Sequence, residues 1–177
     1  MGKIQEEIPV KLIVGFIFSK QEILKKSFRS LIKKFGKIDF ESERLIFNYS
    51  TYYEKEFGED LKRKFISFNK LILPSRLAKT KKFCNSLELK LSEKGKRQIN
   101  IDPGYISASK LVLATTKDFA HRIYLSMGIF AELTLNFRGN SFAACEWTYP
   151  DYKTQEYIQI FNQIRLNYLR QLKENNV

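Results

Sequence analysis

"LIVGFIFSKQEILKKSFRSLIKKFG", residues 12–36, decides the fold class because it places a buried strand directly before an amphipathic helix. Leu12–Phe18 is an uncharged apolar run, which is typical of a central strand covered on both faces. Ser19 and Glu22 have the spacing of a capping box. Apolar residues then recur at helical spacing, at Leu24, Phe28, Leu31, Ile32 and Phe35. The pattern predicts a helix over about 20–35 that ends at Gly36.

The rest of the first half repeats this alternation of strands and helices. Two β-rich runs, about 37–48 and 61–73, are separated by a loop rich in tyrosine. A helix is expected between Pro74 and Gly95, followed by a short strand at 97–101 that the Asp-Pro-Gly sequence at 102–104 should end in a turn. The order β-α-β-β-α-β predicts a ferredoxin-like first half.

The second half changes to antiparallel patterns. Residues 129–137 alternate between apolar and polar side chains, and Gly139-Asn140 is typical of a hairpin tip. Residues 121–126 are expected to pair on the other side, which gives a three-stranded antiparallel meander. Residues 105–118 fit a short helix or a strand. A final helix over about 153–173 completes an α+β fold with a mixed or antiparallel sheet.

Size and composition predict a single globular domain over residues 1–177, ordered from about 10 to 173. A chain of 177 residues that is 44% hydrophobic and 28% charged can bury a full core. The longest apolar run is too short to span a membrane or to form a signal peptide, so a cytoplasmic protein without a membrane partner is expected. Cys84 and Cys145 lack disulfide or zinc-site spacing and are interpreted as small core residues.

Positive charge is concentrated in one segment. The net charge is +12, and residues 61–97 hold twelve Lys or Arg against two acidic residues, which is +10 of that total. Such a cluster attracts polyanions, and the attraction should weaken with salt. The segment therefore predicts either a basic face that docks nucleic acid or an acidic partner, or an ordinary solvated surface.

Several enzyme classes are excluded because their motifs are missing. The sequence contains neither the phosphate loop of nucleotide hydrolases nor the glycine-rich turn of dinucleotide-binding folds. "TTKD" (115–118) differs by one position from the guanine-reading motif of GTPases. H-E-x-x-H, C-x-x-C and G-x-S-x-G are absent as well. The motifs that remain leave the cofactor unknown.

"TTKDFAHRIYL", residues 115–125, concentrates reactive groups around the single histidine, His121. Asp118 precedes it by three positions and could orient the imidazole on a helical turn. With Glu132 as a second carboxylate, His121 and Asp118 are the candidate catalytic residues of a hydrolase or transferase. A structural histidine is the alternative. Convergence of Asp102, His121 and Glu132 would allow a divalent cation, but no metal ligands are assigned.

The favoured function is the binding of a phosphate-bearing ligand, either a nucleotide-like metabolite or RNA. The expected pocket lies between residues 102–105, 117–124 and 147–152, where basic groups would hold the anion and tyrosines would stack on the ligand. The candidate ligand-binding residues are Asp102, Tyr105, Lys110, Lys117, Arg122, Tyr124, Tyr149, Asp151 and Tyr152. The oligomeric state is left open.

Four stretches together resemble one family: "NIDPGY" (100–105), "KLVLATTKDFAHRIYL" (110–125), "GIFAELTL" (128–135) and "WTYPDY" (147–152). They are similar to the bacterial domain of unknown function 4416, and the resemblance runs from about Val10 to Leu172. It implies a single-domain cytoplasmic protein without an established activity. The shared stretches include most of the candidate site without assigning a role to any of it.

Overall fold

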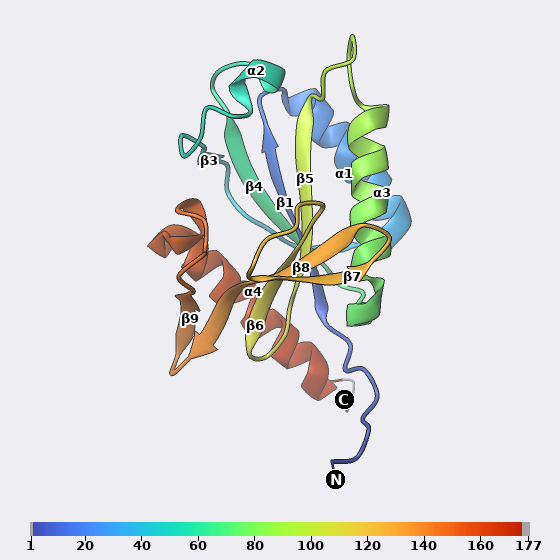
Figure 1. Cartoon of the computed structure of the whole chain (residues 1–177), viewed down its shortest axis with the longest axis vertical. Helices are drawn as coiled ribbons and strands as arrows, with labels where there is room; N and C mark the ends of the chain where they lie inside the picture. The colour runs from blue at the N-terminus through green and yellow to red at the C-terminus, as the bar shows by residue number, and fades with distance from the viewer. Residues whose placement is uncertain (1, 175–177) are drawn as a thin grey trace.

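The computed structural model describes residues 2–174, which form one nine-stranded antiparallel sheet and four α-helices (Figure 1). The strand order is β2-β4-β1-β5-β6-β8-β7, with β3 also paired to β4 and β9 to β8. The strands are β1 (Lys11–Phe18), β2 (Ile38–Glu41), β3 (Leu45–Ile46), β4 (Lys62–Phe68), β5 (Ile99–Ile106), β6 (Lys110–Thr115), β7 (Arg122–Ser126), β8 (Ile129–Arg138) and β9 (Ser141–Ala144). The helices are α1 (Gln21–Phe35), α2 (Glu54–Phe57), α3 (Leu77–Lys90) and α4 (Gln155–Glu174).

The predicted start of the fold is confirmed, except for the cap of its helix. All eight residues of β1 are buried, and α1 follows at the expected position. The expected capping box does not form, because Lys20 is the N-cap and its side chain makes no capping bond. Ser19 instead donates a hydrogen bond of 2.6 Å to the carbonyl of Phe57. Gly36 ends α1 with a φ of 93° and donates its N–H to the carbonyl of Ile32.

The predicted turn at residues 102–104 is wrong, because β5 continues through it. Each residue of β5 pairs with β1, and this pairing outweighs the local turn signal of Pro and Gly. Gly104 is needed for a different reason than a turn. A Cβ at this position would lie 2.7 Å from the side chain of Leu113 and closer still to the carbonyl oxygen of Val112. The glycine therefore allows β6 to approach β5.

The sheet divides where β5 meets β6. The two strands pair over Gly104–Ile106, whereas β6 pairs with β8 along its whole length. The first part of β5 and the end of β6 therefore diverge and leave a gap. Residues 105–118, which fitted a helix or a strand, supply the end of β5 and all of β6.

The second half is antiparallel, but its strand order differs from the predicted meander. β7 pairs with residues 129–132 of β8, and β9 pairs with residues 135–138. β6 pairs with both of these parts of β8, so it must lie along the opposite edge of β8. β7 and β9 therefore follow one another along the same edge. Gly139-Asn140 forms the expected two-residue hairpin tip, and Gly139 has a φ of 60°.

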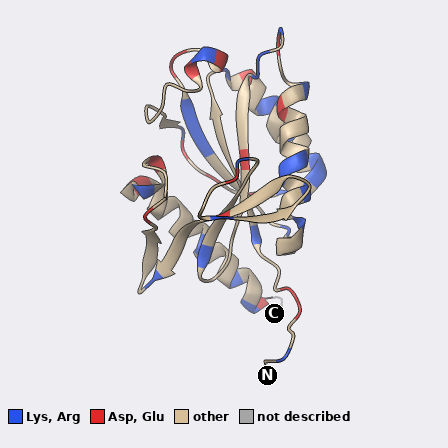
Figure 2. Cartoon of the chain, viewed as in Figure 1, with Lys and Arg blue, Asp and Glu red and all other residues tan. Residues whose placement is uncertain are grey.

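The basic segment 61–97 is distributed over β4, α3 and the loop after α3 (Figure 2). Part of its charge is used inside the protein. Arg63, Lys64, Lys81 and Arg97 each form an ion pair with a carboxylate. Lys79, Lys82 and other exposed lysines of α3 keep their charge at the surface.

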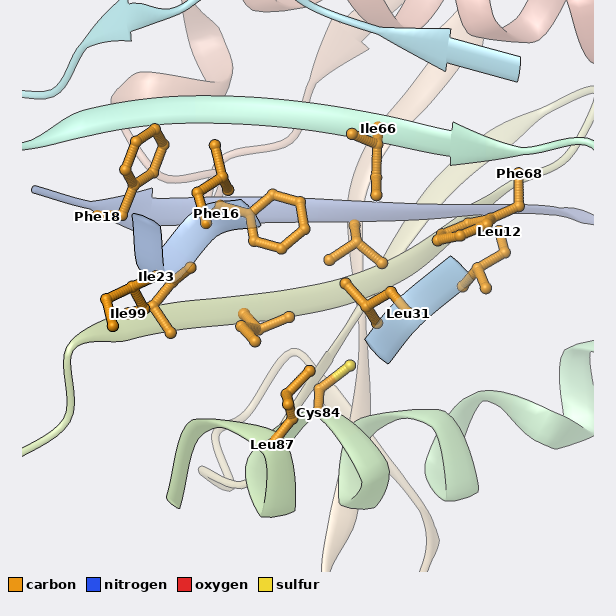
Figure 3. Close-up of a cluster of buried hydrophobic side chains, with 13 residues drawn as sticks. Leu12, Phe16, Phe18, Ile23, Leu31, Ile66, Phe68, Cys84, Leu87 and Ile99 are labelled. Carbon is orange, nitrogen blue, oxygen red and sulfur yellow. The ribbon is translucent and has the colours of Figure 1, made fainter. Parts of the chain in front are cut away.

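The two largest hydrophobic clusters lie on opposite faces of the sheet. In the first, α1 and α3 pack against alternate residues of β1, β4 and β5 (Figure 3). Cys84 lies in this core as expected, whereas Cys145 is half-buried. In the second, α4 packs on the other face with Phe65 of β4 and Leu111 of β6. Within residues 2–174 no helix is both long and apolar enough to cross a membrane.

Candidate functional site

A pocket of about 490 Å³ occupies the gap between β5 and β6. Its walls include β5, α3, the end of β6 with the residues after it, the loop before α2, and the segment before α4. Their principal side chains are Asn100, Asp102, Thr115, Thr116, Lys117, Tyr49, Tyr52, Tyr53, Tyr149 and Tyr152. The pocket thus combines hydroxyl, aromatic and charged groups.

The first part of β5 has no neighbouring strand on the side of β6. Two side chains of α3 form hydrogen bonds with its backbone instead. The ammonium group of Lys81 donates a hydrogen bond of 3.1 Å to the carbonyl of Ile101. The backbone N–H of Ile101 donates a bond of 2.6 Å to the carboxylate of Glu88. Because buried backbone polar groups require partners, Lys81 and Glu88 are held in the interior. They form the helix-side wall of the pocket.

Asp102 projects from this edge into the pocket. Its carboxylate accepts hydrogen bonds from Lys81 at 3.0 Å and from the amide of Asn100. Burial raises the pKa of Asp102, but the positive charges of Lys81 and Arg63, together with these hydrogen bonds, outweigh burial, so the pKa is lowered. Asp102 is therefore a stably ionised carboxylate, and 27% of its side chain is exposed.

A second ion-pair cluster lies beside Asp102. Arg97 donates to both oxygens of Glu56, at 2.8 and 2.7 Å, and to Glu88 at 3.2 Å. Burial raises the pKa of Glu88 above its usual range, although Lys81 opposes this. The hydrogen bonds of Arg97 lower the pKa of Glu56, and this effect exceeds that of burial. The cluster joins α2, α3 and the segment just before β5.

Arg63 forms part of the pocket floor and is buried among aromatic rings. It donates a hydrogen bond of 2.9 Å to Asp151, and its guanidinium lies 5.1 Å from the ring centre of Tyr152. Two of its nitrogens, and the hydroxyl of Tyr152, have no hydrogen-bond partner among the described residues. Aromatic faces compensate part of this deficit through cation–π contacts. The floor therefore holds a buried positive charge whose hydrogen-bonding capacity is only partly used.

Arg122 joins three sides of the pocket. Its guanidinium donates to Glu132 at 2.8 Å, to the carbonyl of Lys117 at 3.1 Å and to the hydroxyl of Tyr149 at 3.0 Å. Burial lowers the pKa of Arg122, but these partners outweigh burial and the pKa is raised. All three nitrogens are thus occupied inside the protein. Arg122 positions the wall that carries Lys117.

His121 contacts Glu132 rather than Asp118. Its Nε2 lies 3.2 Å from the carboxylate that Arg122 also binds, and its ring stacks on Trp147 with 5.3 Å between centres. No hydrogen bond or ion pair joins Asp118 to His121 in the part of the chain described. His121 is not among the residues that line the pocket. The expected orientation of the imidazole by Asp118 is therefore replaced by contacts across strands.

Lys117 is the exception among the cations of the pocket wall. Arg63, Lys81, Arg97 and Arg122 are each paired with an acidic residue. Lys117 makes no ion pair within residues 2–174, and its ammonium group lies 5.1 Å from the ring centre of Tyr52. Its backbone N–H donates to the hydroxyl of Thr115, which shapes the turn after β6.

The structure brings together most, but not all, of the sequence-predicted site residues. Those that line the pocket are Asp102, Lys117, Arg122, Glu132, Tyr149, Asp151 and Tyr152. Those that lie outside its lining are Tyr105, Lys110, Asp118, His121 and Tyr124. Within residues 2–174 no three His, Cys, Asp or Glu side chains gather as potential metal ligands.

Several residues of the pocket were not predicted. They are Arg63, Lys81, Glu88, Arg97 and Asn100. A signal for two of them is present in the sequence: Lys81 and Glu88 share a helical stripe with the apolar Leu77 and Cys84, where a charged side chain must find a buried partner.

Together these features define an α+β protein with a divided antiparallel sheet and a polar, aromatic pocket in the division. The chain belongs to the DUF4416 family, a domain of unknown function, whose model matches residues 8–168. No curated protein and no solved structure matches the chain.

Proposed function

We propose that the protein binds a phosphate-bearing ligand of nucleotide size in the pocket between β5 and β6. The observation that carries this proposal is Lys117, a wall cation without an acidic partner among residues 2–174, beside four cations that are each neutralised. An unpaired ammonium group at a pocket wall is available to an anion.

The other wall groups suit the remainder of such a ligand. A volume of about 490 Å³ lies within the range of small-molecule sites. Tyr49, Tyr52 and Tyr149 are half exposed and can stack on a planar group. Asp102 stays ionised and accepts hydrogen bonds, so it suits a hydroxyl or amino group. A nucleoside monophosphate carries all three features.

Binding of nucleoside monophosphates, measured by calorimetry at low salt, tests the proposal. The matching nucleosides without phosphate serve as ligand controls. Lys117→Ala is expected to weaken binding about tenfold or more, because a charge-assisted hydrogen bond is lost. Lys110→Ala is the matched variant, because Lys110 is an exposed lysine at the start of β6, the strand that precedes Lys117, and does not line the pocket.

Equal affinities of the two variants would contradict the role of Lys117. Equal affinities for nucleosides and their phosphates would contradict the ligand class. Absence of binding by every monophosphate would remove the proposal.

A second candidate function is the binding of RNA along the helices α1 and α3. A groove of about 400 Å³ between these helices favours it, with Phe83 and Leu87 beside three lysines, Lys33, Lys34 and Lys90. Phosphates could contact the lysines while bases lie over the apolar floor.

Fluorescence anisotropy with a single-stranded RNA tests this candidate. Lys33→Glu and Lys90→Glu should weaken binding and reduce its salt dependence, whereas Lys110→Glu should change affinity less. If all three variants have the same effect, net charge and not the groove determines binding.

We also infer that β1, α1, β2, β4, α3 and β5 form a ferredoxin-like unit. The order β2-β4-β1-β5 supports this, together with antiparallel pairing and the packing of both helices on one face. In this assignment the second half extends the sheet beyond β5.

A further inference from the structure

The charges that line the pocket between β5 and β6 almost cancel. Five basic and four acidic residues belong to the lining, which leaves a single net positive charge. The basic residues are Arg63, Lys81, Arg97, Lys117 and Arg122, and the acidic residues are Glu88, Asp102, Glu132 and Asp151. The chain as a whole has a net charge of +12, so nearly all of its excess positive charge lies outside the pocket.

Four of the five basic residues are held by carboxylates of the protein, with distances of 2.7–3.0 Å between the paired atoms. An anion that drew one of them away would leave a carboxylate unpaired in the interior, which is costly. Arg97 is bound twice, because Glu56, outside the lining, shares it with Glu88. The lining therefore offers one cation to a ligand, Lys117, which makes no ion pair within residues 2–174.

Asp102 opposes a second negative charge in the same pocket. Its side chain is 27% exposed, and its carboxylate is held ionised by Lys81 at 3.0 Å and by the amide of Asn100. Like charges repel more strongly inside a pocket than in water, because the effective dielectric constant is lower there. A phosphate with two negative charges would have one of them matched by Lys117, and the other would stay unmatched in the presence of Asp102.

Neutral hydroxyl groups can provide the remaining contacts to a phosphate. Ser50, Thr115 and Thr116 belong to the lining, and the two threonines directly precede Lys117 in the sequence. A hydroxyl group donates a hydrogen bond without adding charge. The lining thus suits a phosphate with one negative charge and further oxygens that accept hydrogen bonds from neutral donors.

We propose that the phosphate of the ligand is a diester with a single negative charge, as in a nucleoside cyclic monophosphate. This inference rests on the proposed function, because it concerns the phosphate of the same ligand. A monoester loses a second proton with a pKa of about 6 and carries a charge of about −1.5 to −2 at pH 7. A diester has no second proton to lose and keeps a single charge. A volume of about 490 Å³ suits a small molecule, so the diester belongs to a single nucleotide rather than to a strand of RNA.

Calorimetry with three matched ligands tests the proposal: a nucleoside 5′-monophosphate, its methyl ester and the 3′,5′-cyclic monophosphate, each with the common bases. The methyl ester is a diester that differs from the monoester by one methyl group and one charge. At pH 8 both diesters should bind at least about tenfold more tightly than the monoester. About 90% of the monoester is singly charged at pH 5 and about 1% at pH 8, so its affinity relative to the diesters should fall by up to about a hundredfold. Protonation of the protein's own groups acts on all three ligands, so the ratio of affinities reports the charge of the ligand.

Thr116→Lys changes the charge of the pocket, because Thr116 is exposed and belongs to its lining. The variant should raise the affinity for the monoester at pH 8 about tenfold and remove most of the preference for diesters. Ser109→Lys is the matched control, because Ser109 is exposed outside the lining and the charge change is the same. Circular dichroism shows whether each variant folds, and the comparison of ligands on the unaltered chain does not depend on the variants.

Tighter binding of the monoester than of its methyl ester at pH 8 would overturn this inference and leave the proposed function intact. The same pH dependence for all three ligands would overturn it as well. Equal effects of Thr116→Lys and Ser109→Lys would contradict it, because the charge of the whole chain and not that of the pocket would then select the ligand. If none of the ligands binds, both this inference and the proposed function are wrong.

Discussion

Replacement of Lys81 by methionine should destabilise the protein because it leaves a buried carboxylate without its partner. Lys81 is 6% exposed and donates hydrogen bonds to the carbonyl of Ile101 and to Asp102. Removal of one member of a buried ion pair costs about 3–5 kcal/mol. The side chain of Asp102 is 27% exposed, so water relieves part of this cost. We therefore expect a loss of about 3 kcal/mol in the free energy of unfolding.

Urea denaturation measures this loss, and a thermal scan should show a melting temperature lower by about 6–12 °C for a chain of this length. Lys82→Met is the control, since Lys82 is exposed on the adjacent position of α3 and makes no ion pair within residues 2–174. Its effect should stay within about 0.5 kcal/mol. Adding Asp102→Asn to Lys81→Met should recover part of the loss, because the stranded charge is removed.

The pH dependence gives a further check of the same pair. The pKa of Asp102 is lowered in the folded protein, so its contribution to stability is present above the unfolded value of about 3.9 and is lost as pH falls through that region. The difference between wild type and Lys81→Met should therefore shrink below about pH 4. If Lys81→Met costs no more than Lys82→Met at neutral pH, the proposed burial of the pair is wrong.

Three further substitutions test other contacts. Gly104→Ala should lower the free energy of unfolding by about 2 kcal/mol or more in urea, since its Cβ would overlap β6; an unchanged midpoint would contradict the close approach of the strands. His121→Ala should shift the emission of Trp147, the single tryptophan, to longer wavelength, because the stacked imidazole no longer shields the indole. Arg122→Lys should weaken ligand binding and lower the free energy of unfolding by about 1–2 kcal/mol, because an ammonium group cannot reach Glu132, the carbonyl of Lys117 and the hydroxyl of Tyr149 at once. Unaltered ligand binding would show that these three contacts do not shape the pocket.

The strand and helix at the start of the chain could be predicted because their signals are local. The apolar run of β1, the periodicity of α1 and the stop at Gly36 require no knowledge of distant residues. The course of β5 could not be predicted in this way. Pro103 and Gly104 have the composition of a turn, yet Pro103 lies opposite Val14 in the paired strands. Long-range pairing prevailed over local propensity there.

The candidate site shows the same difference between what local sequence signals predict and what long-range strand pairing determines. The spacing of three positions between Asp118 and His121 predicts that they meet on a helical turn. In the folded chain, Arg122 lies opposite Glu132 in the β7–β8 ladder, and the adjacent His121 reaches the same carboxylate. The partner is therefore set by strand register, which local spacing does not reveal. The burial of Lys81 is set in the same way, because its partners come from β5, about twenty positions away in the sequence.

The narrow junction between β5 and β6 makes the pocket a meeting point of two halves of the sheet. Three paired residues of β5, Gly104–Ile106, join the halves through the ladder, while both halves contribute to the pocket lining. A molecule bound there would cross-link segments that can otherwise open separately. Its effect on amide hydrogen exchange should thus extend to strands on both sides of the junction, because stabilisation by binding is shared by every segment that must close to form the site.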